Sequence, residues 1–529
     1  MGKKKRNDFR TAFFIGTFLV TLNALGGEVS SDDLKVRLKT GIVVGSREDD
    51  VRTFKSIPFA RPPVGNLRWA PPQPPLHWDG ERSADQFGPP CKQLDASRMS
   101  EAKKVLPAGV WIGAPLMTSG SEDCLSLNVW APRNARKAPV IVYFYGAGGS
   151  ADMPYWNGAA FARDGIVFVN FNYRYLTQGR FAHPALTRVA KPNEPLSRFD
   201  TMDQLQVLHW VQDNIAAFGG DPKNVTIAGV SAGGAAVLQL LTVPRAKGLF
   251  QKAAVESGVG WWAGLSQAEF EQIGVLAAMQ AGLPKQATAE QLRALPLEAL
   301  PQLGLWFWDD RLFPSAPTET FAAGRAIDVP LLIGWNSFDG SSLGSSISAR
   351  EELIARTPPS VLSAYIGESQ TQEDLAYSIW TDVHVAAPAR WIAKMTADGA
   401  PTYVYYFSYL PPDERGKVRG AAHASELPYV FDNWQKSAPG RAILDDMRAA
   451  TKRTHSCWVS FARSGRPSCE GAPEWPRYRA QSDQIMELGT TAQVRKNFRK
   501  LQLDAQEAAM QNDLAAQRQV LEELVRGGF

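Results

Sequence analysis

Residues 225–233 have the sequence VTIAGVSAG, and residues 232–241 that follow are rich in alanine, glycine and leucine. The apolar run predicts a short buried strand, and the Ala/Leu-rich run predicts a helix. A G-x-S-x-G motif lies where the two meet. In such a strand-to-helix turn the serine is exposed and the helix N-terminus lies beneath it, which makes Ser231 a candidate nucleophile. An isolated match would indicate only a Gly/Ser turn.

Further apolar runs predict more strands around this one. They are residues 139–145, 165–172, 252–256, 329–334 and 402–409, with helix-like residues 200–218 between them. Strands buried on both faces and separated by helices are typical of an α/β domain with a large, mostly parallel central sheet. Residues 34–44 alternate polar and apolar side chains and predict antiparallel strands. The helix-rich residues 260–325 and 345–400 are expected to form caps or insertions.

No linker divides the chain, so we expect one domain over residues 27–529. Its last segment, about residues 495–526, has an amphipathic pattern. The apolar residues in it are Leu503, Met510, Leu514, Leu521 and Leu524. This pattern favours a helix that packs on its own domain over a dimer seam, and a monomer or a homodimer remains possible.

The composition of the 529-residue chain is that of a globular protein. It has 57 Lys+Arg against 53 Asp+Glu and is 44% hydrophobic, which excludes a disordered chain or a small disulfide scaffold. The whole surplus of +4 lies in residues 1–10 (MGKKKRNDFR), and the remainder balances at 52 against 52. The basic surplus therefore argues for export and not for nucleic-acid binding, and no nucleic-acid partner is expected.

The basic N-terminus precedes about 15 apolar or small residues, 11–25. This pattern predicts a signal peptide over residues 1–26 and a periplasmic or secreted protein. The run is shorter than the roughly 20 residues of a spanning helix, so no stable membrane span is expected after its removal; an uncleaved anchor is the alternative. In an exported protein the four cysteines, Cys91, Cys124, Cys457 and Cys469, are expected to form disulfides. Three pairings are possible, and sequence-local pairing is the simplest.

A serine nucleophile needs a base and an acid that follow it in the chain. His423 lies in a loop of small residues, GAAHASE, after a predicted strand, whereas His384 and His455 lie in helix-like segments. Asp339 follows the predicted strand 329–334, although Asp-Gly is also a common turn. Ser231, Asp339 and His423 are therefore the candidate catalytic triad.

The chain resembles the type-B carboxylesterases, the α/β-hydrolase family that includes the cholinesterases, from about residue 36 to about residue 489. The similar segments are FGGDP (218–222) with VTIAGVSAG, EDCLSLNV (122–129), IPFA (57–60) with PPVG (62–65), HASELPYVF (423–431) and WP (475–476). The resemblance implies an α/β-hydrolase fold and a serine carboxylesterase with Ser231, Asp339 and His423 as its triad. It also implies an oxyanion hole of Ala147, Gly148 and Ala232, a Cys91–Cys124 bridge, a small-molecule ester substrate, and no metal or cofactor.

Three positions depart from the family pattern. Val230 stands where the family usually has a buried Glu, Asp339 is shorter than the usual Glu, and Ala147 replaces a glycine of the oxyanion loop. A backbone shift must restore the reach of Asp339. Ala147 keeps its N–H but its methyl group could narrow the acyl pocket.

Other functions are less consistent with these motifs. Residues 146–151 (GAGGSA) mimic a dinucleotide-binding turn, but PYWNG at 154–158 blocks the helix that such a turn must open. A non-catalytic relative that only binds would be expected to lack a triad residue, and a lipase or peptidase on the same fold is a further alternative. Labelling by a serine-directed organophosphate would separate an enzyme from a binding protein.

The 16 tryptophans include Trp261 and Trp262, just after the predicted strand 252–256, and Trp306 and Trp308 in a predicted insertion. An aromatic-lined pocket built from them would suit a bulky apolar or aromatic ester. Core packing is the alternative for each of these side chains.

Overall fold

The fold was examined in a computed structural model of the chain. It describes residues 1–2, 31–92, 104–105, 111–113, 120–258, 260–261, 263–303, 307–309, 311–368 and 371–527. The predicted signal peptide, apart from residues 1–2, and the side chains of Trp262 and Trp306 lie outside the described residues.

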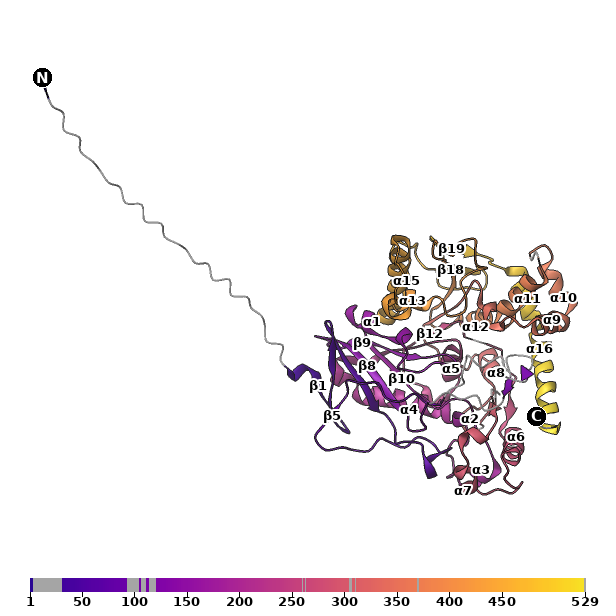
Figure 1. Ribbon diagram of the computed structural model, residues 1–529. Helices are drawn as coiled ribbons and strands as arrows, with labels where there is room; N and C mark the ends of the chain where they lie inside the picture. Colours follow the sequence, from indigo (N-terminus) through magenta and orange to yellow (C-terminus); the bar gives the residue numbers. More distant parts are fainter. Residues whose placement is uncertain are drawn as a thin grey trace.

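An 11-stranded sheet forms the centre of the molecule (Figure 1). Its strand order is β19-β18-β17-β16-β12-β11-β9-β10-β8-β4-β3. The strands are β3 (Ser46–Glu48), β4 (Val51–Pro58), β8 (Ser126–Pro132), β9 (Ala138–Phe144), β10 (Val167–Phe171), β11 (Gly220–Val230), β12 (Lys252–Glu256), β16 (Leu331–Asn336), β17 (Thr402–Phe407), β18 (Gln484–Leu488) and β19 (Ala492–Lys496). In this spatial order, every neighbouring pair between β18 and β10 is parallel. Antiparallel strands lie at both edges of the sheet. The predicted large, mostly parallel sheet is therefore confirmed.

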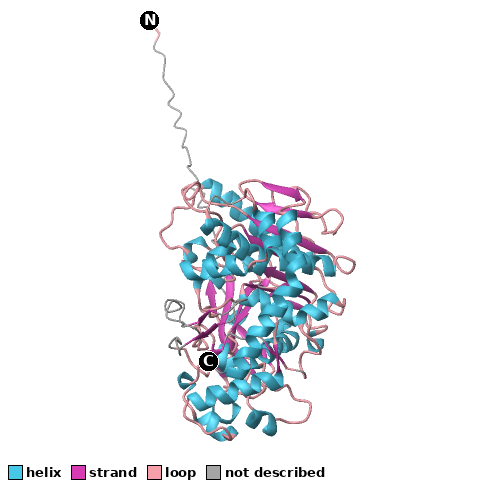
Figure 2. Ribbon diagram, turned by 90° about the vertical axis from the view of Figure 1, so that its right-hand side faces the viewer, coloured by secondary structure: helices cyan, strands magenta, loops and turns pink. Residues whose placement is uncertain are grey.

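Burial explains why these runs became central strands. Every residue of β10, β12 and β16 is buried, because helices cover both faces of the sheet. Helices α1 (Ala159–Arg163) and α15 (Asp445–Ser464) pack on one face, and α4 (Phe199–Asn214), α5 (Ala232–Leu240) and α12 (Ala387–Thr396) pack on the other. Figure 2 shows helices on both sides of the strands. Among the helices in the described part of the chain, none is long and apolar enough to cross a membrane.

The remaining elements surround this core. The helices are α2 (Leu176–Gly179), α3 (Pro184–Val189), α6 (Gln267–Gln280), α7 (Ala289–Ala294), α8 (Pro317–Ala322), α9 (Ile347–Arg356), α10 (Pro359–Leu362), α11 (Gln372–Thr381), α13 (Leu427–Val430), α14 (Trp434–Ser437) and α16 (Lys500–Gly527). The smaller strands are β1 (Lys35–Leu38), β2 (Gly41–Val44), β5 (Glu81–Ser83), β6 (Lys104–Val105), β7 (Trp111–Gly113), β13 (Leu265–Ser266), β14 (Gln302–Leu303) and β15 (Phe307–Trp308). β1 and β2 are antiparallel, as residues 34–44 predict.

The C-terminal helix α16 packs on its own chain, against α12, α10 and α6. Leu503, Met510 and Leu521 are buried, and Leu514 is partly buried against the core. The helix begins at Lys500 rather than near residue 495, because residues 492–496 pair with β18 as an edge strand.

Candidate active site

Ser231 lies in the turn between β11 and α5. Its backbone has φ +56° and ψ −122°, a strained conformation for a residue with a side chain. Its N–H donates to the carbonyl of Glu256 on the neighbouring strand at 2.8 Å. A Cβ on Gly233 would lie 2.0 Å from the carbonyl oxygen of Phe144, so a glycine is required there. The turn thus has the geometry of a nucleophile elbow.

The glycine-rich loop after β9 passes directly beside Ser231. A Cβ on Gly146 would lie 3.1 Å from the Cβ of Ser231. The loop is a tight turn in which the N–H of Gly149 donates to the carbonyl of Gly146 at 3.0 Å, and Gly148 has φ +75°. Ala147 is exposed at its tip. The candidate oxyanion residues are therefore next to the candidate nucleophile.

Asp339 and His423 are in contact. The Oδ1 atom of Asp339 lies 2.6 Å from Nδ1 of His423, while Oδ2 accepts from the N–H of Asn336 at 2.8 Å and from Oγ of Ser257 at 2.9 Å. Asp339 is completely buried, and the His423 side chain is 21% exposed. The shorter acid reaches the imidazole, and both of its oxygens have partners.

The loop that carries His423 is held against the end of β16. The N–H of Phe338 donates to the carbonyl of Ala421 at 2.8 Å, and the N–H of His423 donates to Oγ of Ser341 at 2.9 Å. The amide of Asn336 donates to the carbonyl of Ala422 at 2.8 Å. These bonds place the His423 backbone within reach of Asp339.

Two opposing effects act on the imidazole of His423. Burial disfavours the charged form, but the hydrogen bond and the negative charge of Asp339 outweigh it and raise the pKa of His423 above its ordinary value. His455 has partners in another part of the molecule, since its Nε2 lies 3.0 Å from Oδ2 of Asp164. Burial lowers the pKa of His384 to about 4. Of these three, only His423 contacts a completely buried carboxylate at the end of a central strand.

This geometry agrees with the similarity of the chain to known proteins. The sequence profile of the Carboxylesterase family matches residues 32–361 and 359–506. The chain belongs to the carboxylesterase family. It is a carboxylic ester hydrolase with the α/β-hydrolase fold.

Individual relatives are similar over nearly their whole length. The fumonisin B1 esterase of Sphingopyxis macrogoltabida is 32% identical, with 90% of each chain covered. The para-nitrobenzyl esterase of Bacillus subtilis (strain 168) is 32% identical over 86% of this chain and 94% of its own. Among solved structures, a carboxylesterase of Geobacillus stearothermophilus is 29% identical with a TM-score of 0.75, and 89% of this chain and 99% of that chain are covered.

Four polar residues of the carboxylesterase site were not singled out from the sequence. Ser257 and Asn336 bind Asp339, and the carboxyl groups of Glu256 and Glu426 are buried nearby. Three of them lie at or just after the C-terminal ends of strands β12 and β16, where ligands bind in α/β folds. A polar residue at the end of an apolar run was the signal that could have identified Glu256, Ser257 and Asn336.

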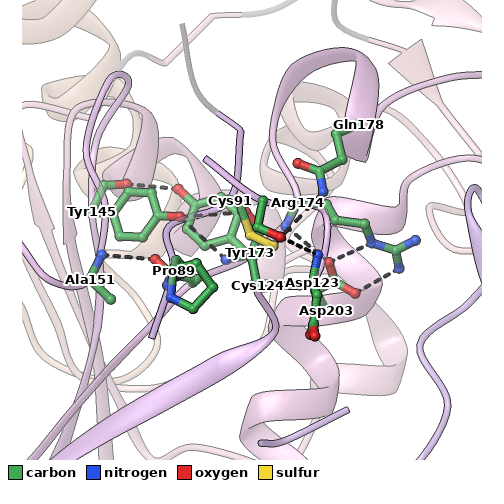
Figure 3. The surroundings of a disulfide bond; sticks show 12 residues. Pro89, Cys91, Asp123, Cys124, Tyr145, Ala151, Tyr173, Arg174, Gln178 and Asp203 are labelled. Atoms are coloured by element: carbon green, nitrogen blue, oxygen red, sulfur yellow. Dashed lines mark hydrogen bonds and ion pairs between the residues drawn. A yellow bond between two sulfur atoms is a disulfide. The ribbon is translucent and has the colours of Figure 1, made fainter. Parts of the chain in front are cut away.

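Both disulfides of the carboxylesterase are sequence-local, Cys91–Cys124 and Cys457–Cys469. Figure 3 shows the first with Tyr145 and Tyr173 in its surroundings. The rings of these two tyrosines stack with centroids 4.6 Å apart, and the hydroxyl of Tyr173 donates to the carbonyl of Tyr145 at 2.8 Å. Tyr145 also begins the glycine-rich loop, so the start of that loop is held by Tyr173.

Two of the four candidate pocket tryptophans, Trp261 and Trp308, are among the described residues. Trp261 is buried in the main hydrophobic core, and its Nε1 has no hydrogen-bond partner in the described part of the chain. Trp308 lines a cavity of about 530 Å³ together with Trp391 and Met510. Neither observation connects these side chains with Ser231.

A second cavity is lined in part by the last residue of the 3₁₀ helix that begins at Asp339. Its volume is about 560 Å³, and it lies between α9, α11, the π-helical turn η11 (Asp382–Ala386) and α16. It is lined by Leu343, Trp380, Val383, His384, Ala516 and Val520, among others. Leu343 ends the 3₁₀ helix η9 (Asp339–Leu343) that begins at Asp339, and the carbonyl of His384 accepts from the N–H of Gly260 at 3.3 Å.

Candidate metal ligands are sparse. Within the ranges that the structure describes, no group of three or more His, Cys, Asp or Glu is arranged to hold a metal ion.

Proposed function

We propose that this carboxylesterase hydrolyses esters through an acyl-enzyme, with Ser231 as nucleophile, His423 as general base and Asp339 as the acid that orients His423. A continuous series of contacts supports this assignment. The N–H of Ser231 binds the carbonyl of Glu256, the adjacent Ser257 binds Asp339, and Asp339 binds His423. The 2.6 Å Asp339–His423 contact carries the proposal.

The steps follow from the roles of these groups. Nε2 of His423 takes the proton of the Ser231 hydroxyl as Oγ attacks the ester carbonyl, and His423 then protonates the departing alcohol. Water attacks the acyl-enzyme in the same way and releases the acid. Asp339 holds the proton of His423 on Nδ1, so that Nε2 is free to act, and stabilises the imidazolium.

The oxyanion of each tetrahedral intermediate is assigned to the N–H groups of Ala147, Gly148 and Ala232. The closeness of the Gly146 turn to Ser231 supports this assignment, and Ala232 is the first residue of α5, where N–H groups have no intrahelical partner. Each such donor contributes about 10²- to 10³-fold in rate.

Replacement of the nucleophile tests the mechanism directly. Ser231→Ala should abolish turnover of an activated short-chain ester, because no other group can form the acyl-enzyme. Stoichiometric labelling by a serine-directed organophosphate should disappear in the same variant. Ser342→Ala, at a serine whose hydroxyl donates to the carbonyl of Asp339, is a control for loss of a nearby hydroxyl. Wild-type turnover by Ser231→Ala would rule out the mechanism.

We propose further that the substrates are esters with a bulky apolar or aromatic group, and that the 560 Å³ cavity beside η9 receives this group. The apolar side chains in its lining and the ring of Trp380 support the proposal. The name of one relative, a para-nitrobenzyl esterase, also denotes an aromatic group. In this proposal the bulky group of the ester lies between η11 and the C-terminal helix α16.

A pair of matched tryptophan substitutions on α16 tests the role of the cavity. Ala516 lines it, whereas Ala508 is exposed on the same helix and lines neither cavity. Ala516→Trp should raise KM for a benzyl or long-chain ester about tenfold while an acetyl ester is unaffected, the effect of losing about 1.4 kcal/mol of binding. Ala508→Trp should leave both esters unchanged. Equal KM values for all three proteins with the bulky ester would exclude the cavity as its site.

We propose further that residues 1–26 are removed on export and that residues 27–529 form one domain. The two disulfides support export, because disulfides persist in oxidising compartments. Fractionation of the source cells with N-terminal sequencing of the mature protein tests this. An intact N-terminus in the cytoplasmic fraction would contradict it.

A further inference from the structure

The cavity beside η9 contains one imidazole whose nitrogen atoms the protein itself does not bind. His384 lies in the π-helical turn η11 and lines this cavity. Its ring packs on the indole of Trp380, with the ring centroids 3.9 Å apart. Within the described part of the chain, no hydrogen bond reaches either ring nitrogen of His384. A polar ring that lines a cavity and lacks a partner is a candidate contact for a bound molecule.

The imidazole of His384 is neutral at ordinary pH. Burial lowers its pKa to about 4, and no charged group contributes to this shift. A neutral imidazole has one N–H donor and one acceptor nitrogen. A hydroxyl group both donates and accepts a hydrogen bond, so it can pair with either nitrogen of the ring. A carbonyl group pairs only with the N–H, and an ammonium group only with the acceptor nitrogen.

The turn that carries His384 packs against segments that follow two strands of the site. On one side, the N–H of Gly340, the neighbour of Asp339, donates to Oγ1 of Thr381 at 2.8 Å. Thr381 is the last residue of α11 and directly precedes η11. On the other side, the N–H of Gly260 donates to the carbonyl of His384 at 3.3 Å. η11 therefore contacts the segments that follow β16 and β12.

Most other polar side chains of the cavity lining are paired within the protein. The pairs are Glu352–Arg356 on α9, and Gln517–Asp513 and Gln519–Glu523 on α16. His384 differs from them because its ring nitrogens have no partner among the described residues. Leu343, Val383 and Val520 add apolar surface to the lining. An aromatic group would pack on this surface, and a hydroxyl on it would regain from His384 a hydrogen bond that it loses on leaving water.

We propose that His384 is a specificity-determining residue that binds a hydroxyl group on the bulky part of the ester. The preferred substrates are then esters whose aromatic group carries a hydroxyl. This inference rests on the proposed function, because it requires that the cavity beside η9 receives the bulky group. His384 takes no part in the chemical step, in which His423 is the proposed base.

A pair of esters that differ by one hydroxyl measures this preference. The wild-type protein should have a KM for para-hydroxyphenethyl acetate about five- to tenfold below that for phenethyl acetate, as expected for one hydrogen bond in a cavity. His384→Phe keeps a ring but has no polar atom in it, so the two KM values should become equal. His384→Gln, whose amide both donates and accepts, should retain part of the preference. A purely structural role for His384 would change both KM values together.

His209→Phe is the matched control, because His209 is exposed on α4 and lines neither cavity. This variant should keep the wild-type ratio of KM values. Ethyl para-hydroxyphenylacetate and ethyl phenylacetate repeat the comparison with the ring on the acid side of the ester. The inference would be overturned if the wild type preferred the hydroxylated ester in neither pair, or if His384→Phe kept the preference.

Binding of alcohols separates failure of this inference from failure of the proposed function. Para-hydroxyphenethyl alcohol and phenethyl alcohol contain no ester, so isothermal titration calorimetry measures their affinities without a catalytic step. The wild type should bind the hydroxylated alcohol more tightly, and His384→Phe should not. If Ala516→Trp weakens both alcohols but His384→Phe leaves their ratio unchanged, the cavity binds the bulky group and only this inference fails. If Ala516→Trp changes neither affinity, the proposed role of the cavity fails and this inference fails with it.

Discussion

At the scale of single residues, the turn at Ser231 shows why the motif needs its glycines. The backbone at Ser231 is strained, and the bond from its N–H to Glu256 holds it in that conformation. Gly229 and Gly233 approach so closely that a Cβ on Gly229 would lie 2.7 Å from the carbonyl carbon of Gly233. The strained conformation is therefore stabilised by the surrounding structure rather than by local propensity.

Asp339 allows a prediction about pH. Because the pKa of His423 is raised and its neutral imidazole is the proposed base, activity should be lost as the pH falls through a value above the ordinary 6.5. Asp339→Asn removes the charge that raises this pKa, so the acid limb should move to lower pH. The rate should also fall about 10³- to 10⁴-fold, because the amide no longer fixes the imidazole tautomer.

The measurement is kcat/KM for a short-chain ester as a function of pH. Asp445→Asn is the control, since that side chain is 99% exposed and its ion pair is with Arg448. An acid limb at the same pH in Asp339→Asn would show that Asp339 does not set the pKa of the base.

At the scale of elements, the ends of β12 and β16 assemble the site. Pairing of these parallel strands aligns Glu256 with Gly334. Ser257 and Asn336 therefore both lie at the C-terminal ends of the strands. Both donate to Asp339. The 82-residue separation between Ser257 and Asp339 shows that strand order, rather than sequence proximity, creates the acid's environment.

The two disulfides are predicted to contribute unequally to stability. Cys91–Cys124 closes a loop of sequence separation 33, and Cys457–Cys469 closes one of 12. Loop-closure entropy gives roughly 3.7 kcal/mol for the first and roughly 2.8 kcal/mol for the second. Replacing the cysteines of each pair by serine should lower the free energy of unfolding in that order.

Urea unfolding of the two double variants, compared with the wild type, measures this difference. The Cys457–Cys469 variant serves as the matched control for the loss of any disulfide. A larger loss of stability from the shorter loop would contradict the loop-closure explanation.

At the scale of the whole molecule, α16 is held to the body in part by Arg390, a buried arginine of α12. Arg390 on α12 donates to Asp483 at 2.9 Å and to Asp504 on α16 at 2.8 Å, and its side chain is only 3% exposed. Farther along the helix, Gln517 accepts from the N–H of Ala263 at 2.9 Å. The wall of the cavity beside η9 therefore depends on contacts between segments more than 90 residues apart.

Removal of this anchor should destabilise the protein. Arg390→Ala leaves Asp483 buried without its ion-pair partner and should cost about 3 to 5 kcal/mol of unfolding free energy. Arg448→Ala is the control, because that side chain is 63% exposed and its ion pair with Asp445 is worth less than about 1 kcal/mol. Thermal unfolding compares the two. An equal, small effect in both variants would mean that Arg390 does not stabilise the packing between α12, α16 and the segment of Asp483.

Much of this carboxylesterase could be predicted from its sequence. Apolar runs such as residues 252–256 and the turn chemistry around Ser231 are local signals, and they were sufficient for the sheet, the elbow and the family. The simplest pairing of the four cysteines, between neighbours in the sequence, is also the pairing in the structure. Asp339 and His423, predicted from their positions after strands, are in contact, and their catalytic roles stay predictions.

Only the tertiary structure brought together the groups that surround this pair. The positions of Glu256, Ser257, Asn336 and Glu426 depend on strand register and on the loop that carries His423, and periodicity carries no information about either. The cavity against α16 likewise arises from helices far apart in sequence. Local patterns determine which residues form strands, turns and helices, whereas buried polar contacts and cavities arise only when distant segments exclude water from one another.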